Sequence, residues 1–366
     1  MLTAGTRGVF ARLALLSAAL WCCAPAERPV LAIALFESSV AAARLAVHDA
    51  AEAGSRPMFD TLIRYESGGE ASQAIQLARD LVATRGLVGV VGHSNSASSL
   101  AAAQVYNDAH VVQLAPTSTA VLYSQAGPYS FRMVPPDDQQ GKFLAETVQR
   151  QFPNGARVAL LYVNDDYGRG LRASVLAALD TTGYALVLDI SHVDTDVRPA
   201  VIEQATRAAS EARPDVVLWL SRSGMLYQYL PPLREALGDT PIIAGDAVST
   251  WPHHVHSDDR WAGVQHVDFV DLAADDSLRA FAARFEATYG TRASGADVLT
   301  YDAVRVLIAG IDDGATTGAL LREYLTSLGR ARPAFKALSG EIVFTERGDV
   351  ARQHLLVTIP SQRGRP

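Results

Sequence analysis

The sequence predicts an α/β fold with parallel sheets in two lobes. Short apolar runs of strand length alternate along the chain with segments of helical periodicity, which is the pattern of βαβ units. The chain has 366 residues, too many for one typical hydrophobic core. No long linker or low-complexity tract separates its halves. That continuity is consistent with a chain that passes between the lobes more than once.

A first series of elements leads into residue 115. Its expected strands are the apolar runs at 31–35, 60–65 and 87–91, with a further run that ends at Ala115. Helices are expected at 40–53 and 72–84 from the spacing of their apolar residues. A helix-like segment also follows residue 95. Glycine breaks at 68–69 and at 86 separate these elements.

A second series begins near residue 141. Its expected strands are 158–163, 185–191, 216–221 and 242–244, and its expected helices are 142–151, 170–182, 198–212 and 226–236. Right-handed crossovers place such helices on both faces of a sheet. The remainder does not continue this series. There we expect helices at 277–289 and 303–311, and a terminal hairpin formed by 341–344 and 355–359.

Residues 1–26 predict a secretory signal peptide. Arg7 and Arg12 precede a short apolar run at 13–23, and Ala24-Pro25-Ala26 supplies a small-residue exit. Cleavage after Ala26 would release a soluble protein. A lipid on Cys22 or Cys23 would instead anchor the protein to a membrane, and both outcomes stay open. Either outcome places the protein in the periplasm or another extracytoplasmic space.

Composition and motifs exclude several classes of function. The formal net charge is -7 and no basic stripe is present, so nucleic acid is not an expected partner. Nucleotide-binding fingerprints and a G-x-S-x-G elbow are absent. The histidines at 253, 254 and 256 match no regular zinc spacing, and no cysteine follows Cys23. We therefore expect no cofactor, no metal and no enzymatic activity.

The stretch 88–141 predicts a binding pocket. One apolar run ends in glycine and a hydroxyl cluster that includes Ser96, and the next ends in Ala115-Pro116-Thr117-Ser118-Thr119. Ligands bind at the carboxyl ends of strands in open parallel sheets, and neutral donors there suit an anionic group. Ser and Thr after a strand are also common helix caps. On pattern alone, both interpretations of Ser96 and Thr119 stay open.

A series of short motifs is spread over roughly residues 30 to 360. They are Val90-Val91-Gly92-His93 with Ser96 and Ser98, Leu114-Ala115-Pro116 with Ser118 and Thr119, Phe131-Arg132 with Asp137, Gln140 and Gly141, Asp165-Asp166-Tyr167-Gly168, Tyr301-Asp302-Ala303-Val304, and Gly340-Glu341-Ile342-Val343-Phe344 with Gly348-Asp349. Together they resemble the substrate-binding proteins of ABC importers for branched-chain amino acids and related ligands, which have the type 1 periplasmic-binding fold.

The resemblance implies two Rossmann-like lobes with parallel sheets, joined by three crossovers and closing by hinge motion on a cleft between them. Residues 27–137 plus 268–335 would form lobe 1, and residues 138–267 plus 336–366 would form lobe 2. Ser96, Thr117 and Thr119, with Ser118 in the same cluster, would hold the ligand carboxylate. Asp246 would hold the ligand ammonium in a charge-assisted pair, and Tyr167 would face the cleft.

Two departures from the family pattern bear on the ligand. The loop after the first strand, residues 35–39, is shorter than the family's Gly-rich loop. Arg222 follows a second-lobe strand, where it would suit a second carboxylate or a phosphate; the other interpretation is a solvated surface arginine. Asp246 and Tyr167 also have ordinary alternatives, as a cap and as packing at the cleft mouth.

The function implied is that of an exported, monomeric solute-binding protein. It would capture a small amino-acid-like ligand and deliver it to a membrane ABC permease. The first alternative is a lipoprotein of the same fold that regulates a partner protein such as a cell-wall synthase. The second alternative, against the expectation above, is an enzyme.

Overall fold

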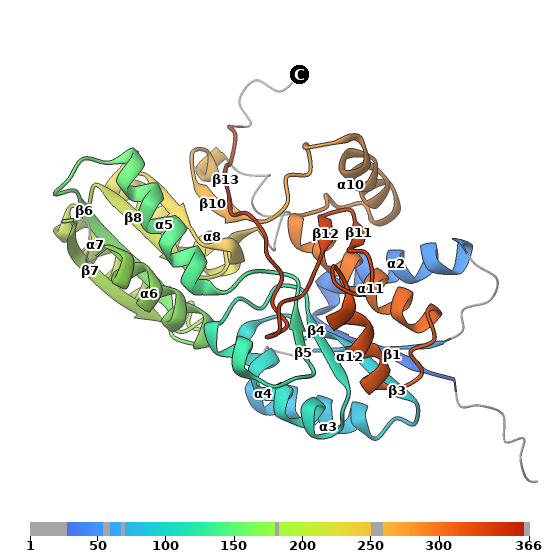
Figure 1. Ribbon diagram of the computed structural model, residues 1–366. Coiled ribbons are helices and arrows are strands. Elements are labelled where there is room, and N and C mark those ends of the chain that lie inside the picture. Colours follow the sequence, from blue (N-terminus) through green and yellow to red (C-terminus); the bar gives the residue numbers. More distant parts are fainter. Residues whose placement is uncertain (1–27, 54–58, 67–69, 180–182, 250–258, 362–366) are drawn as a thin grey trace, which may run out of the picture.

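The computed structural model describes residues 28–53, 59–66, 70–179, 183–249 and 259–361. Within these ranges the chain forms two α/β lobes, each built around its own sheet (Figure 1). The expected signal peptide lies outside the described residues. None of the described helices is both long and apolar enough to cross a membrane.

The sheet of the first lobe is parallel throughout, with the strand order β2-β1-β3-β4-β5. Its strands are β1 (Val30–Leu35), β2 (Asp60–Tyr65), β3 (Leu87–Gly92), β4 (Val112–Ala115) and β5 (Ser130–Arg132). The central strands read as unbroken apolar runs because helices bury both of their faces.

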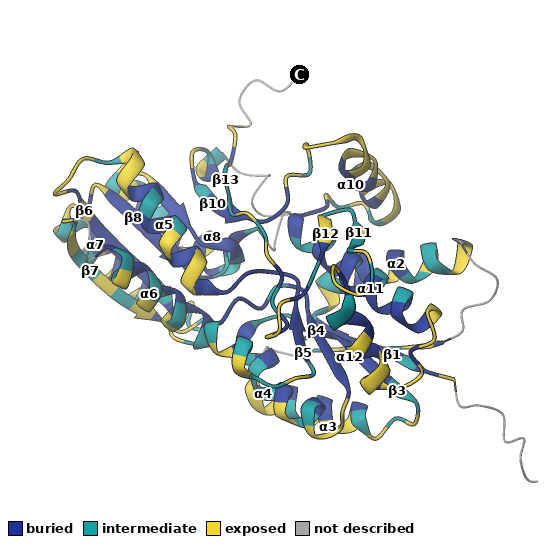
Figure 2. Cartoon of the chain, viewed as in Figure 1, coloured by how far each residue is buried: buried dark blue, intermediate teal, exposed yellow. Residues whose placement is uncertain are grey.

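Alternation along β1 assigns its side chains to two different cores. Ala32 and Ala34 pack with the helices α3 (Ala71–Val82) and α4 (Ser96–Asp108). Leu31 and Ile33 belong to the core that includes α2 (Val40–Ala53), α11 (Gly295–Asp312) and α12 (Gly318–Ser327). Figure 2 shows the consequence: the central strands are buried, and exposed residues lie on the outer helix faces and on edge strands such as β7.

The sheet of the second lobe has the order β13-β10-β9-β8-β6-β7 and is parallel except for the β10–β13 pair. Its strands are β6 (Arg157–Val163), β7 (Ala185–His192), β8 (Val216–Leu220), β9 (Ile242–Ala244), β10 (Gln265–Asp268) and β13 (Leu355–Thr358). The helices on its two faces are α5 (Asp137–Gln151) with α6 (Asp166–Leu179), and α7 (Pro199–Ala212) with α8 (Ser223–Leu237).

Three connections join the lobes. The first, residues 133–136, leads from β5 into α5, and the second, residues 269–275, leads from β10 into α10 (Asp276–Tyr289). The helices α10 and α11 pack on α2 of the first lobe. The third, residues 343–354, follows a small hairpin of β11 (Phe335–Ala337) and β12 (Gly340–Ile342) and ends in β13. The predicted α/β fold with parallel sheets, two lobes and three crossovers is confirmed, whereas the residue boundaries of the lobes stay a proposal.

The expected terminal hairpin of residues 341–344 with 355–359 is wrong. β12 pairs with β11, and β13 pairs with β10 of the second lobe. The segment between them is held on the first lobe before it leaves: Phe344 packs edge-on against Phe131 with ring centroids 5.2 Å apart, and Gly348 O accepts a hydrogen bond from Arg132 N at 3.0 Å. The turn-like composition of residues 346–349 therefore belongs to a crossover.

Candidate functional site

A cavity of about 590 Å³ lies where the carboxyl ends of the two sheets face each other. Its first-lobe wall follows β1, β3 and β4, and its second-lobe wall follows β6, β7, β8 and β9. Ligands of open parallel sheets bind at such strand ends. Five of the seven site residues expected from the sequence line it: Ser96, Thr117, Tyr167, Arg222 and Asp246.

The first-lobe wall presents hydroxyl groups at the start of α4. Asn95 is the cap of this helix, since its side chain accepts a hydrogen bond from the backbone of the first turn at 2.9 Å. Ser96 is therefore not the cap; its Oγ accepts from Ala120 N at 3.2 Å, which leaves its own O–H free to donate. Thr117 Oγ1 donates to Ser94 O at 3.2 Å. Donors at a helix N-terminus suit an anionic group.

Ser118 and Thr119 lie behind this wall. Both are fully buried, and neither lines the cavity. Ser118 Oγ lies 2.6 Å from Ser99 Oγ on α4, so it joins the loop to the helix. The backbone oxygen of Thr119 accepts from Asp137 N at 2.8 Å. We propose that these two residues shape the loop, while Ser96 and Thr117 reach the cavity.

Asp246 supplies a buried carboxylate on the second-lobe wall. It follows β9 and is only 5% exposed. Its Oδ1 accepts from Tyr167 Oη at 2.9 Å and from Gln140 Nε2 at 2.9 Å. Its Oδ2 accepts no hydrogen bond from the described part of the chain. A carboxylate placed in this way at a cavity suits a cationic group.

Burial sets the protonation behaviour of this region. Desolvation raises the pKa of Asp246 to about 6, against the hydrogen bonds from Gln140 and Tyr167, which lower it. Desolvation, followed by the charge of Asp246, raises the pKa of the neighbouring Asp137 well above its usual range. Burial likewise raises the pKa of Tyr167. With a pKa of about 6, Asp246 is ionised near neutral pH, and burial opposes ionisation of both Asp137 and Tyr167.

Arg222 lines the cavity but is already paired. Its Nη2 donates to Asp165 Oδ2 at 2.6 Å and its Nη1 donates to Asp194 Oδ2 at 2.9 Å. Asp165 also accepts from Gly168 N at 2.9 Å and so caps the start of α6. The guanidinium charge is thus offset by two carboxylates. This environment disfavours the second carboxylate or phosphate that Arg222 alone would suit.

Several residues of the cavity carried no recognisable signal in the sequence. Apolar groups come from Phe36 after β1, Met225 on α8 and Phe285 on α10. Asp194 was not singled out either, although it follows a strand and pairs with Arg222. Phe285 reaches the cavity through the second crossover, which no local pattern predicts. Ser94 does belong to the same hydroxyl cluster as Ser96, and that cluster was the available signal.

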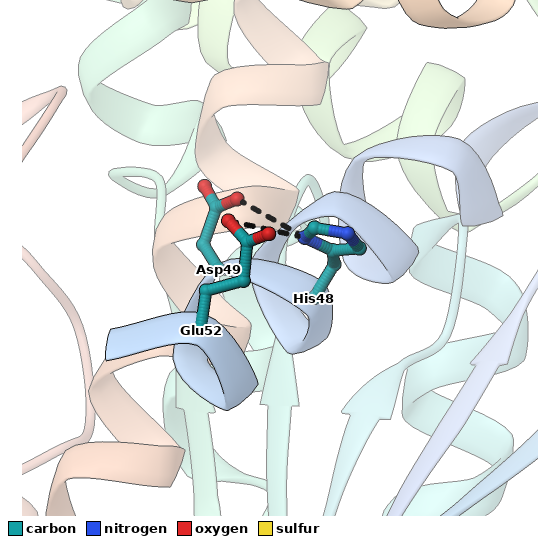
Figure 3. A group of neighbouring side chains, drawn as sticks. All are labelled: His48, Asp49 and Glu52. Atoms are coloured by element: carbon teal, nitrogen blue, oxygen red, sulfur yellow. Dashed lines mark ion pairs between the residues drawn. The ribbon is translucent and has the colours of Figure 1, made fainter. Parts of the chain in front are cut away.

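One group of metal-ligand type occurs within the described ranges, on α2 (Figure 3). His48, Asp49 and Glu52 each offer a ligand atom, all within 4.8 Å of one another. The Asp49 carboxylate is occupied, because it accepts from Arg284 at 2.6 and 3.1 Å and from Tyr301 Oη at 2.7 Å. Asp49 therefore joins α2 to α10 and α11. The histidines at 253, 254 and 256 lie outside the described residues.

Comparisons with known proteins agree with this geometry. A family model described as "Periplasmic binding protein" matches residues 30–363. An "Amino acid binding protein" of Pseudomonas aeruginosa is 32% identical over 128 residues, which span 35% of this chain and 34% of that protein. The "Leucine-, isoleucine-, valine-, threonine-, and alanine-binding protein" of the same organism is 25% identical over 305 residues, covering 78% of this chain and 74% of that one.

A solved structure shows the same fold. It is the ABC transporter substrate-binding protein of Desulfitobacterium hafniense in complex with Leu, which superposes with a TM-score of 0.73. Its sequence is 22% identical, and the match covers 90% of this chain and 97% of that one.

Proposed function

The chain belongs to the periplasmic binding protein family, and from that premise we propose that it captures a small amino-acid-like ligand between its lobes and delivers it to an ABC importer. The family consists of solute-binding proteins rather than enzymes, and it is extracytoplasmic. We propose that the protein acts as a monomer beside a membrane permease, either free after cleavage at Ala26 or held by a lipid on Cys22 or Cys23.

One observation carries the proposal of an amino-acid-like ligand. Hydroxyl donors and a carboxylate line opposite walls of one cavity: Ser96 and Thr117 on the first lobe, Asp246 with Tyr167 on the second. An α-amino acid has a carboxylate and an ammonium to match them, and apolar residues such as Phe36 and Met225 would face its side chain. Because Arg222 is offset by Asp165 and Asp194, a neutral or cationic side chain fits better than an acidic one.

A thermal-shift screen tests the proposed ligand class. We expect α-amino acids to raise the melting temperature, because a ligand at 100 times its Kd stabilises the folded state by about 3 kcal/mol. Dicarboxylates, simple amides and short peptides form the comparison groups. If no α-amino acid shifts the melting temperature and a compound of another group does, the ligand belongs to that other group.

Delivery needs a separate experiment. The ligand-bound protein should stimulate ATP hydrolysis by the complete ABC importer in proteoliposomes, and the ligand-free protein should stimulate it less. A stable complex with a cell-wall synthase, formed without ligand and without any effect on a permease, would support the regulatory alternative.

The pH dependence of binding follows from Asp246. Its pKa is raised to about 6, so it is ionised above pH 6 and becomes protonated below. The ammonium of an α-amino acid stays charged across this range, and the ion pair is therefore lost as the pH falls. We expect affinity at pH 5 to be about tenfold weaker than at pH 7.5. Calorimetry at the two pH values checks this, and equal affinities would remove an ionised Asp246 from the site.

A further inference from the structure

Gln140 hydrogen-bonds both the side chain and the backbone N–H of Asp246. It lies in the first turn of α5, directly after the first crossover, and it is fully buried. Its Nε2 donates to Asp246 Oδ1 at 2.9 Å and to Asp137 Oδ1 at 3.1 Å. Its Oε1 accepts from Asp246 N at 2.9 Å. Both amide hydrogens and the amide oxygen are used, which fixes the orientation of this side chain.

The loop that carries Asp246 is fitted closely to this amide. A Cβ added to Gly245 would lie 3.1 Å from Gln140 Oε1 and 2.5 Å from Tyr167 Oη. Glycine at this position therefore lets the backbone approach both side chains. Gln140 and Tyr167 together hold Oδ1 of Asp246, which lines the cavity.

The crossover is tied to the same cluster through Asp137. Its backbone N–H donates to Thr119 O of the first-lobe loop at 2.8 Å, and its side chain accepts from Gln140. One amide thus connects a first-lobe loop, the crossover and the second-lobe carboxylate.

We propose that Gln140 is the positioning residue of the cavity: it fixes the Asp246 carboxylate and stabilises its ionised form, so that the carboxylate is charged when a cationic group arrives. The expected effect of Gln140 on ligand binding rests on the proposed function. The effect on the ionisation of Asp246 is a property of the ligand-free protein and is tested separately.

The charged and titratable groups around Asp246 come from three elements. Asp137 lies on α5, Tyr167 on α6, and Asp268 at the end of β10. The negative charge of Asp268 opposes ionisation of Asp246, as does burial, whereas the Gln140 and Tyr167 hydrogen bonds favour it. Removal of the Gln140 amide therefore removes one of the two side-chain donors that favour ionisation of Asp246. Burial and the charge of Asp268, which oppose its ionisation, remain.

The experiment compares Gln140→Leu with Gln139→Leu, a matched change at the exposed neighbouring position on the same helix. The Asp246 side-chain carboxyl is titrated by carbon-13 NMR in the ligand-free protein and assigned by its loss in Asp246→Asn. We expect a midpoint near pH 6 in the wild type and in Gln139→Leu. In Gln140→Leu it should rise by about one to two pH units, since a hydrogen bond to a charged group is lost.

A midpoint in Gln140→Leu equal to that of the wild type would overturn the inference. If this variant does not fold, Gln140→Met provides an unbranched side chain without the amide and carries the same expectation. L-leucine is the probe for binding, and its affinity profile against pH should shift by the same amount as the titration. A purely structural role of Gln140 would weaken binding at every pH without moving the midpoint.

The two proposals fail in different ways. If L-leucine and other α-amino acids do not bind the wild type, the proposed ligand class is lost and the NMR titration still decides the role of Gln140. If they bind with the expected pH dependence and the titration does not move, only the role of Gln140 is lost.

Discussion

Asp246→Ala is expected to weaken the binding of an α-amino acid at pH 7.5 by about 100-fold or more. The substitution removes a buried carboxylate that would face the ligand ammonium, and loss of one partner of a buried, hydrogen-bonded charge pair costs roughly 2–5 kcal/mol. Tyr167 and Gln140 would also lose their shared acceptor. Calorimetry against the best ligand of the thermal screen measures the change.

The fold is expected to survive this substitution. Because burial raises the pKa of Asp246, its ionised form opposes folding at neutral pH, and its removal relieves that cost. Asp246→Asn is the milder variant, and Asp138→Ala is the control, since Asp138 is exposed on α5 and its Oδ1 accepts from the neighbouring Gln139 N at 2.9 Å. Unchanged affinity in folded Asp246→Ala would place the ligand ammonium elsewhere.

Much of the fold could be predicted because parallel strands buried on both faces are unbroken apolar runs. The run expected at residues 31–35 is β1 (Val30–Leu35), and the run at 216–221 is β8 (Val216–Leu220). The short strands β5 and β10 gave no such signal, because Arg132 and Asp268 are polar residues that become buried only through tertiary contacts. The final hairpin was wrong because turn composition does not reveal which sheet a strand joins.

The candidate site, too, was predicted only in part. Ser96, Thr117 and Arg222 were singled out because each follows a strand, and strand ends converge in this architecture, whereas Tyr167 and Asp246 were singled out from the family resemblance. Gln140 stood in a recognised motif but received no role, since its partner Asp246 lies 106 residues away. The pairing of Arg222 with Asp165 and Asp194 likewise depends on three separate strand ends coming together. Such long-range pairs are fixed by packing and leave no local pattern.

Arg132 links the third crossover to the loop that follows β4, part of which lines the cavity, although its side chain is fully buried. Its Nε donates to Asp349 Oδ1 at 2.6 Å, and its Nη1 donates to Ala120 O at 2.9 Å and to Ser118 O at 3.3 Å. Nη2 donates to the Ser124 hydroxyl. One guanidinium therefore fixes both the chain that returns to the second lobe and the loop behind Ser96 and Thr117.

We expect Arg132→Met to lower the free energy of unfolding by about 3–5 kcal/mol, the usual cost of removing one partner of a buried ion pair. The cost arises because Asp349 loses its cationic partner and the carbonyl groups of Ser118 and Ala120 each lose a donor where water has little access. Urea unfolding measures it, and Arg150→Met is the matched control, with an exposed side chain 3.7 Å from Glu146 and an expected change within about 0.5 kcal/mol.

A double-mutant cycle with Asp349→Asn separates the ion pair from the loop contacts. If the ion pair supplies most of the stability, Arg132→Met will lower the free energy of unfolding only slightly in the Asp349→Asn background. If the carbonyl contacts dominate, the cost will persist, and ligand affinity will fall as well, because Ala120 N is the donor to Ser96 Oγ. A stability equal to the wild type in Arg132→Met would show that neither set of contacts holds the crossover, and the third connection would then depend on its other contacts, among them the Phe131–Phe344 packing and the backbone hydrogen bond from Arg132 N to Gly348 O.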